Sequence, residues 1–340
     1  MSVTIRNYQS SDLPALCALV DAADRHDRTK RALAPTPAEG IPLFLFAPRY
    51  PLGTERGLTA VELRGRLGTL IERIPGYVLV ASGSGSHLES CAAVYPTSRG
   101  RNQSWMLEWI LASGCRTQAA ARALLSATIG LIRELANQDG PPDTLSVEGR
   151  CLEGDLQSQA FLMAVGFTSV RVFAILDRDL KEAHRIVSSA SVPDVDVRSY
   201  ESADGPAWVE MFNAAFATHW GSTPFTLERW TRHDQSPRFR PALSLVAETN
   251  GRIIGISHTT PDLAPGEEHT AHLHILGVHP DHQGRGVGRA LLMEGLSRLR
   301  QGGFDCWDLD VDTENGAAMA LYHAVGFRRR EAISISRLWI

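Results

Sequence analysis

The sequence predicts two α/β domains, each a mixed sheet with helices, arranged in tandem along one chain. Its 340 residues are 44% hydrophobic, which is enough material for two buried cores. Two segments repeat the same order of strands and helices, and each ends in the tetrad Ala-Val-Gly-Phe, at Ala164–Phe167 and Ala324–Phe327. The repeat favours a duplicated domain over one large domain.

Each half opens with a strand and a capped helix. Thr4–Tyr8 reads as a strand before the cap Ser10–Asp12, and Val195–Tyr200 reads as a strand before the cap Ser202–Asp204. An apolar helix is predicted after each cap. The same local chemistry therefore starts both halves.

Each half then gives an apolar strand and a long amphipathic helix. The strands are predicted at 106–111 and 273–278, and the helices at 118–135 and 286–300. The segment Lys181–Asp194 has linker composition and places the seam, so the predicted domains are 1–180 and 195–340. Arg28–Leu58, rich in proline, has no clean period and is expected to form a lid or an interface.

Composition excludes several classes of protein. A net charge of −4 gives no basic field for nucleic acid, and no apolar run approaches the ~18 residues that span a bilayer. With no apolar secretory segment after Met1, a cytoplasmic location is expected. The 5 cysteines form no pattern and are expected to be reduced thiols; no metal site is predicted.

A glycine-rich turn follows the second of these strands and opens directly into a helix. Gly284, Gly286 and Gly288 remove side chains where backbone N–H groups can converge, and the helix start adds its positive dipole end. This order suits a diphosphate, although a tight turn without ligand is the plain alternative. The dinucleotide pattern G-x-G-x-x-G and the Walker pattern both fail, because the glycines alternate and no Lys follows.

The loop resembles the acetyl-CoA loop of the GCN5-related N-acetyltransferase (GNAT) superfamily, Q/R-x-x-G-x-G/A after V-x-P. The matching residues are Val278, Pro280 and Gln283-Gly284-Arg285-Gly286-Val287-Gly288. A second family signature is matched by Asn315, Ala318, Leu321, Tyr322, Gly326 and Phe327. The chain is similar to tandem members such as mycothiol synthases over nearly its full length, with specific motifs only in residues 197–340.

The resemblance implies two tandem GNAT-type acyl-CoA N-acyltransferase domains with acetyl-CoA as co-substrate. In the family, the strand before the loop splays from its neighbour and pairs with the pantetheine arm, while the loop amides take the pyrophosphate. A tyrosine at the position of Tyr322 protonates the departing thiolate in the family, so Tyr322 is the expected general acid; packing at the edge of the core is the alternative. The implied cofactor-binding residues are Leu276, Gly277, Val278, Gln283, Gly284, Arg285, Gly286, Val287, Gly288, Arg289 and Asn315.

An amine nucleophile must lose a proton before it attacks, so a base is expected on the strand before the loop. Mycothiol synthases commonly carry a Glu at the position aligned with His272. His272 and His274 alternate with apolar residues and share one strand face, so one of them is a candidate base; a structural or substrate-contact role is the alternative. Glu248, on the preceding strand, is a reserve candidate.

The segment Phe216–Pro224 lies where this family generally shapes its acceptor pocket. His219 and Trp220 are the expected substrate contacts and suit a polar, ring-bearing amine. Local packing is the alternative for both side chains.

The first half is predicted to have lost the chemistry. Alignment by element order keeps Arg116 but puts Ser113 where the proline should be, and it replaces two loop glycines by Ala119 and Ala121. Leu162 then stands at the position of Tyr322, and Asp155 at that of Asn315. A structural domain that closes one side of the acceptor cleft is expected, with a silent acetyl-CoA site as the alternative.

The sequence thus predicts an N-acetyltransferase that moves an acetyl group from acetyl-CoA to a primary amine of a small molecule by direct attack. No G-x-S-x-G motif suggests a covalent intermediate. Mycothiol synthase itself and a non-catalytic acyl-CoA sensor remain alternatives. His272 in place of Glu favours an amine other than the mycothiol precursor. Tyr322 argues against a sensor, because ligand binding alone does not require an acid at that position. The chain could be a monomer or a homodimer.

Overall fold

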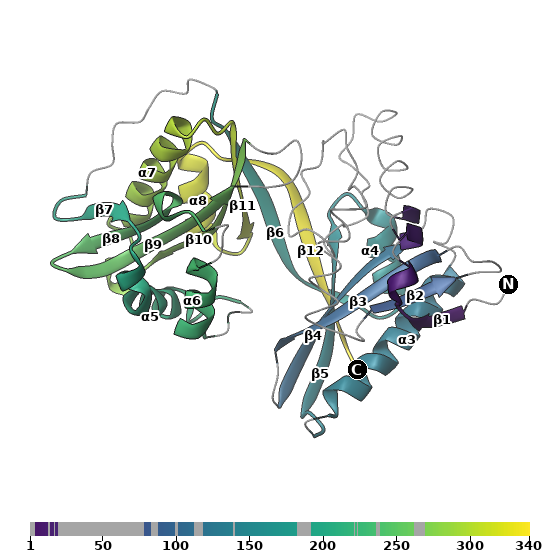
Figure 1. The fold of residues 1–340 in the computed structure, drawn as a ribbon. Coiled ribbons are helices and arrows are strands. Elements are labelled where there is room, and N and C mark those ends of the chain that lie inside the picture. Colours follow the sequence, from purple (N-terminus) through teal and green to yellow (C-terminus); the bar gives the residue numbers. More distant parts are fainter. Residues whose placement is uncertain are drawn as a thin grey trace. The chain divides into compact units, whose positions relative to one another are not determined.

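The computed structural model describes residues 4–12, 14–16, 18–19, 78–82, 88–98, 101–111, 118–138, 140–181, 192–220, 222, 224–235, 239–261 and 269–340. The chain forms two compact units, shown in Figure 1. The first unit is Met1–Phe173 with Glu331–Ile340, and the second is Ala174–Arg330. The expected lid or interface at 28–58, the loop counterpart at 112–117 and most of the predicted linker lie outside the described residues.

The first unit is a mixed sheet with a crossover helix. Its strand order is β1-β2-β3-β4-β5-β12, antiparallel except for the parallel pair β4–β5, which α3 connects. Apolar residues of α3, such as Leu124 and Ile132, pack into a core with the strands. The elements are β1 (Thr4–Asn7), β2 (Val78–Ser82), β3 (Leu88–Ser98), β4 (Asn102–Leu111), α3 (Gln118–Ala136), β5 (Thr144–Leu152), α4 (Leu156–Ala164) and β12 (Arg328–Trp339).

The second unit repeats this plan. Its strand order is β6-β11-β10-β9-β8-β7, with antiparallel pairs from β7 to β10 and a parallel pair β10–β11, which α7 connects. The elements are β6 (Thr168–Asp179), β7 (Asp196–Ser199), α5 (Gly205–Phe216), α6 (Leu227–Asp234), β8 (Ser244–Thr249), β9 (Arg252–Pro261), β10 (Thr270–Val278), α7 (Val287–Gln301), β11 (Cys306–Asp312) and α8 (Gly316–Ala324).

The two units exchange their last strands. Residues Ile333–Trp339 of β12, at the end of the second half, pair antiparallel with β5 and complete the sheet of the first unit. The end of β6, from Ala174, belongs to the second unit, where Leu180 donates its N–H to the carbonyl of Asp305 at 2.8 Å. The compact units therefore differ from the predicted halves 1–180 and 195–340 at their final strands.

A repeated ion pair fixes the first corner of each unit. The guanidinium of Arg6 holds both carboxylate oxygens of Asp12 at 2.7 Å, and that of Arg198 holds those of Asp204 at 2.7 and 2.8 Å. Each pair ties a strand to the short 3-10 turn after it, at Ser10–Asp12 and Ser202–Asp204. The hydrogen bonds hold the pKa of both carboxyl groups below its usual range.

The repeated tetrad is a helix end. Gly166 and Gly326 follow α4 and α8 with φ of 98° and 95°, a left-handed conformation that favours glycine. The next residues, Phe167 and Phe327, donate their N–H groups back to the helices and bury their rings. This pattern of hydrogen bonds is a Schellman motif, so the tetrad is explained by its backbone geometry.

Candidate active site

The parallel pair β10–β11 opens partway along its length. Its register runs from Thr270↔Cys306 to Leu273↔Leu309, although β10 continues to Val278. The other edge of β10 stays paired with β9 as far as Val278↔Gly255. Backbone groups of Ile275–Val278 on the β11 side are therefore not part of that ladder and can pair with an extended ligand. Leu276, Gly277 and Val278, which were predicted to contact the cofactor, lie in this stretch.

The glycine loop stands at the end of this opening. Gly284 and Gly286 have φ of 73° and 87°, and Gly286 is the N-cap of α7. A Cβ built on Gly284 meets nothing within 4 Å, and 283–286 is exposed. The side-chain amide of Gln283 donates to the carbonyl of Val278 at 3.1 Å and ties the loop to the strand end. The N–H groups that open α7 are thus presented to solvent beside Arg285 and Arg289, which suits an anion.

The third glycine of the loop, Gly288, is explained by close packing rather than by its backbone conformation. A Cβ on Gly288 would lie 3.2 Å from Cδ2 of Leu321 on α8 and 3.6 Å from Cγ2 of Val278. Val287 beside it is buried in a cluster with Leu291. These two positions bring the start of α7 against α8 and β10, so they shape the loop by packing.

Tyr322 lies on the α7 and α8 side of the sheet. It is 7% exposed, packs in one core cluster with Leu273 and Leu309, and meets the ring of Phe327 at 5.7 Å. Burial raises the pKa of its phenol. The hydroxyl therefore stays protonated at neutral pH and can serve as a hydrogen-bond donor.

His272 lies on the opposite side of the sheet. Side chains alternate along a strand, so His272 and Asp308 point away from the face that Leu273 and Leu309 share with Tyr322. Both are 5% exposed, and Nδ1 of His272 lies 2.7 Å from Oδ1 of Asp308. The ring of His274 meets that of His272 edge to face at 4.5 Å, which places both histidines on one face as predicted.

Two further histidines, His258 on β9 and His233 on α6, continue the row that starts with His272 and His274. Nε2 of the exposed His274 lies 2.7 Å from Oγ1 of Thr260, and its ring stacks on that of His258 at 5.7 Å. His258 is 1% exposed and contacts Oγ of Ser244 and Nε2 of His233, each at 2.7 Å. Burial lowers the pKa of His258 to about 3, so this imidazole is neutral.

The expected acceptor segment packs against the cofactor strand. A Cβ on Gly277 of β10 would lie 3.0 Å from both Ala215 and Phe216 at the end of α5. His219 stands one turn further, with its ring 5.7 Å from that of Phe216 and its Nδ1 3.0 Å from the carbonyl of Trp220. Both residues are half-buried, so the segment is near the opening while its polar atoms are engaged locally.

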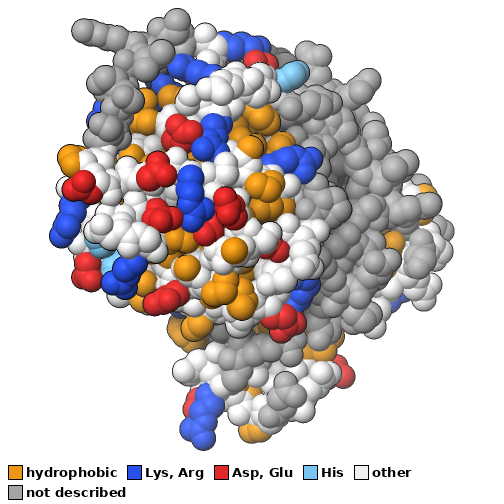
Figure 2. All heavy atoms as spheres, turned by 60° about the vertical axis from the view of Figure 1, so that its left-hand side comes forward, with side chains coloured by type: hydrophobic (Ala, Val, Ile, Leu, Met, Phe, Trp, Pro, Cys, Tyr) orange, Lys and Arg blue, Asp and Glu red, His pale blue; other side chains and the backbone are white. Residues whose placement is uncertain are grey.

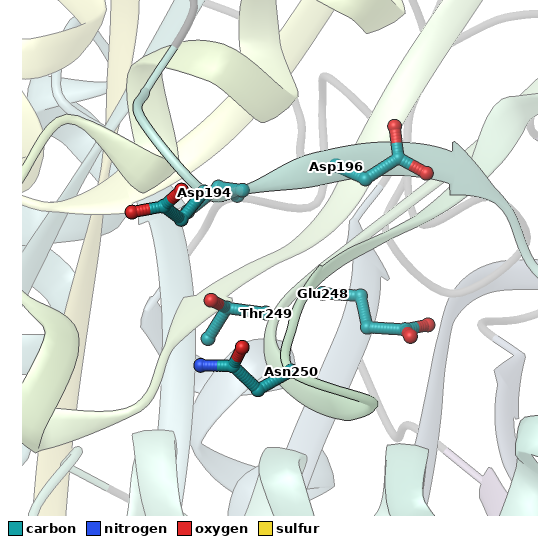
Figure 3. A pocket seen from close by; sticks show the side chains of 6 residues that line it. Asp194, Asp196, Glu248, Thr249 and Asn250 are labelled. Carbon is teal, nitrogen blue, oxygen red and sulfur yellow. The ribbon is translucent and has the colours of Figure 1, made fainter.

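Two further residues named from the sequence have structural partners. Asn315 is the N-cap of α8, with its Oδ1 accepting from the N–H of Ala318 at 3.1 Å. Glu248 accepts from Arg198 at 2.9 Å and lines an open hollow of about 350 Å³ with Asp194, Val195, Asp196, Thr249 and Asn250. Figure 3 shows Asp194 and Asp196 across from the turn that follows β8. Three carboxylates make this hollow unsuited to a diphosphate.

Charged side chains of both signs are mixed on the face of the molecule that Figure 2 shows. This face therefore carries no field of one sign. Within the described ranges, no group of three or more His, Cys, Asp or Glu is placed to hold a metal ion. Nor is any helix of the described part long and apolar enough to cross a membrane.

Asp308, His258 and His233 were not among the residues predicted from the sequence. The acidic residues of Asp308-Leu309-Asp310-Val311-Asp312 alternate with apolar ones, and this pattern is the sequence signal for a polar strand face beside β10. No local pattern marked His258 or His233, because their contact depends on tertiary packing.

Comparisons with known proteins agree with this geometry. Residues 205–327 match the Acetyltransferase (GNAT) family. A mycothiol acetyltransferase of Kocuria rhizophila is 30% identical over 97% of both chains, and one of Thermomonospora curvata is 35% identical over 65% of this chain and 70% of its own. The chain belongs to the GNAT acetyltransferase family. It is thus an acetyl-CoA-dependent N-acetyltransferase, and the family and enzyme class predicted from the sequence are confirmed.

Solved structures extend the likeness to the whole chain. A GCN5-related N-acetyltransferase from Sphaerobacter thermophilus has a TM-score of 0.74 at 18% identity and covers 99% of this chain and 95% of its own. A tandem GNAT protein from the clavulanic acid biosynthesis pathway has a TM-score of 0.66 at 13% identity over 99% and 98%. At these identities the likeness shows the fold alone, and it confirms the predicted tandem mixed-sheet architecture.

Proposed function

We propose that this enzyme transfers the acetyl group of acetyl-CoA to a primary amine of a small molecule by direct attack in the second unit. The observation that carries the proposal is the opening between β10 and β11. His272 lies on one face of the sheet beside it, Tyr322 on the other, and the glycine loop at its end. The attacking amine needs a base and the leaving thiolate needs a proton donor. A candidate for each lies on one of the two faces.

The residues present fit acetyl-CoA. The exposed amides from Gly284 to the first turn of α7, with Arg285 and Arg289, would hold the diphosphate, and the free edge of Leu276–Val278 would pair with the pantetheine arm. Asn315 would contribute through its exposed amide while its oxygen caps α8. Acetyl-CoA supplies an activated thioester; the protein supplies orientation, a base and a proton donor.

His272 is the preferred base. Glu248 is committed to an ion pair with Arg198, whereas the imidazole of His272 retains Nε2 beyond its contact with Asp308. His274 is exposed and lies in contact with His272, so it is placed to contact the acceptor. His219 and Trp220, at the end of α5, would form the wall of the acceptor site.

Tyr322 acts as a donor to the leaving sulfur. Because burial raises its pKa, the phenol is a weaker acid than a thiol, whose pKa is about 8.5. A hydrogen bond from the phenol to the developing thiolate stabilises the charge without complete proton transfer.

The names of the relatives favour a second, narrower candidate. Both relatives compared above are named mycothiol acetyltransferase, so the cysteinyl pseudodisaccharide that mycothiol synthase acetylates is the first acceptor to test. His272 at the position commonly held by Glu favours a different small amine, such as an amino-sugar. The first unit would have a structural role.

The test is turnover with a panel of amines that includes this pseudodisaccharide, amino-sugars and amino acids. Release of free CoA by the full chain supports the proposal, and Tyr322→Phe should lower kcat by about 10²-fold or more while acetyl-CoA binds as before. Calorimetric binding of acetyl-CoA without turnover on any amine would instead indicate a sensor. No heat with CoA or acetyl-CoA from folded protein would reject the site itself.

A further inference from the structure

A buried carboxylate and imidazole form a cross-strand pair inside the second unit. The parallel register puts His272 of β10 opposite Asp308 of β11, and the Nδ1–Oδ1 distance is 2.7 Å. An ionised carboxylate only accepts hydrogen bonds, so the shared proton is on Nδ1 and the lone pair of the ring is on Nε2. The register of the sheet thus places a carboxylate at Nδ1 of His272.

The second oxygen of this carboxylate faces a cation. Nη2 of Arg330 lies 3.9 Å from Oδ2 of Asp308, and Nη1 lies 4.0 Å from Oδ2 of Asp177. Burial raises the pKa of Asp177, with the charge of Asp308 adding to the effect and that of Arg330 opposing it. The guanidinium of Arg330 therefore lies on the side of the carboxylate away from the oxygen that contacts His272.

We propose that Asp308 is a positioning residue that holds His272 as the Nδ1–H tautomer and stabilises the imidazolium formed when Nε2 takes the proton of the acceptor. This inference rests on the proposed function. The acceptor ammonium gives one proton to Nε2 of His272; its nitrogen then forms the C–N bond as the C–S bond breaks. A second proton from nitrogen goes to the thiolate sulfur, and His272 releases its proton to solvent, so the net yield is amide, free thiol and one proton.

The surroundings of His272 explain why this carboxylate matters. The group facing it from β11 is Asp308, from β10 it is His274, and Arg330 and Asp177 stand behind the carboxylate on β12 and β6. Beyond His274 lie His258 on β9 and His233 on α6, whose pKa values burial lowers. Among these groups, Asp308 is the carboxylate within hydrogen-bond distance of the His272 ring, so it is the group placed to stabilise an imidazolium there.

The experiment compares Asp308→Asn with the matched control Asp305→Asn in the full chain. Asp305 stands just before β11 and pairs with Lys181 at 2.8 Å. Nitrogen-15 NMR of labelled histidine, assigned with His272→Gln, reports the tautomer and titration of His272 without turnover. The pH profile of kcat/KM and calorimetric binding of acetyl-CoA complete the set.

Asp308→Asn should lose the Nδ1–H tautomer and lower kcat by about 10²–10⁴-fold, with acetyl-CoA affinity unchanged. The acid limb of kcat/KM should move to lower pH, because an imidazolium without its carboxylate releases its proton more readily; Asp305→Asn should match wild type. Wild-type turnover together with an unchanged tautomer and acid limb in Asp308→Asn would overturn the positioning role alone. Binding of acetyl-CoA without turnover in wild type would overturn the proposed function and this role with it.

Discussion

The two units of this chain share one backbone fold and differ in the side chains at corresponding positions. Their parallel pairs end at corresponding places, Leu107↔Gly149 in the first unit and Leu273↔Leu309 in the second. Asp155 caps α4 as Asn315 caps α8, with oxygen-to-amide distances of 3.0 and 3.1 Å. The features that both units keep are those that build the fold: caps, helix ends and the opening of the sheet.

The side chains around the opening separate the units. Leu162, at the position of Tyr322, is 1% exposed, and its Cδ2 would lie 3.3 Å from a Cβ on Gly149. By strand register, Met106 and Glu148 stand where the second unit has His272 and Asp308. Glu148 pairs with Arg337 of the exchanged strand. Where the second unit has the proposed base, its carboxylate and the proposed proton donor, the first unit has core packing and an ion pair.

The comparison is tested most severely by Leu162→Ala. The change removes a fully buried side chain, so we expect the first unit to lose about 2–5 kcal/mol of unfolding free energy, measured by chemical denaturation. Acetyl transfer should be unchanged where the variant is folded, because no reacting group lies there. A drop in kcat/KM comparable to that of Tyr322→Phe, in folded protein, would show that the first unit takes part in the chemistry.

Local sequence patterns predicted much of this comparison. The predicted helix at 118–135 is observed as Gln118–Ala136, and that at 286–300 as Val287–Gln301. The glycine loop also follows from short-range rules of conformation. Alternation predicted the shared face of His272 and His274, whose rings do meet, although a register shift between Leu273 and Ile275 interrupts the alternation. Such patterns are set within a few residues, so the sequence shows them directly.

Other features depend on partners distant in the sequence. The alternation in Arg328–Trp339 marks a strand, but nothing local tells which sheet it joins, and it joins that of the first unit. The contact of Asp308 with His272 spans 36 residues and depends on strand register. Gly288 was interpreted as a ligand-binding position, and its contact with Leu321 became visible only when α7 and α8 were packed together.

Acid pH should affect the second unit more, because all the histidines among the described residues lie there. The pKa of His258 is about 3 in the folded unit and ~6.5 when unfolded, so between these values the unfolded chain binds a proton that the folded chain does not. Stability from this group is complete above pH ~6.5 and falls as the pH drops, by at most about 1.4 kcal/mol per pH unit. The lowered pKa of His233 acts in the same direction.

Denaturation of wild type and His258→Gln at several values between pH 7 and pH 4 measures this slope. The variant should be less stable at pH 7, since Ser244 and His233 lose a partner, but its stability should fall less on acidification. Equal slopes in both proteins would mean that His258 is not the group that titrates.

The smallest expected effect comes from a pair of glycine substitutions that separates ligand binding from backbone strain. Gly284 and Gly303 are both in the second unit, with φ of 73° and 76°, and a Cβ on either meets nothing within 4 Å. Alanine at either position should therefore cost the same roughly 1–2 kcal/mol of unfolding free energy. Of these two glycines, Gly284 alone lies in the loop before α7. Gly284→Ala should therefore also weaken the binding of acetyl-CoA, measured by calorimetry, by about tenfold or more, because its methyl group would occupy the space of the diphosphate. Equal affinities in the two variants would show that the loop is a turn without a ligand, and the contrast between the units would then lie in packing alone.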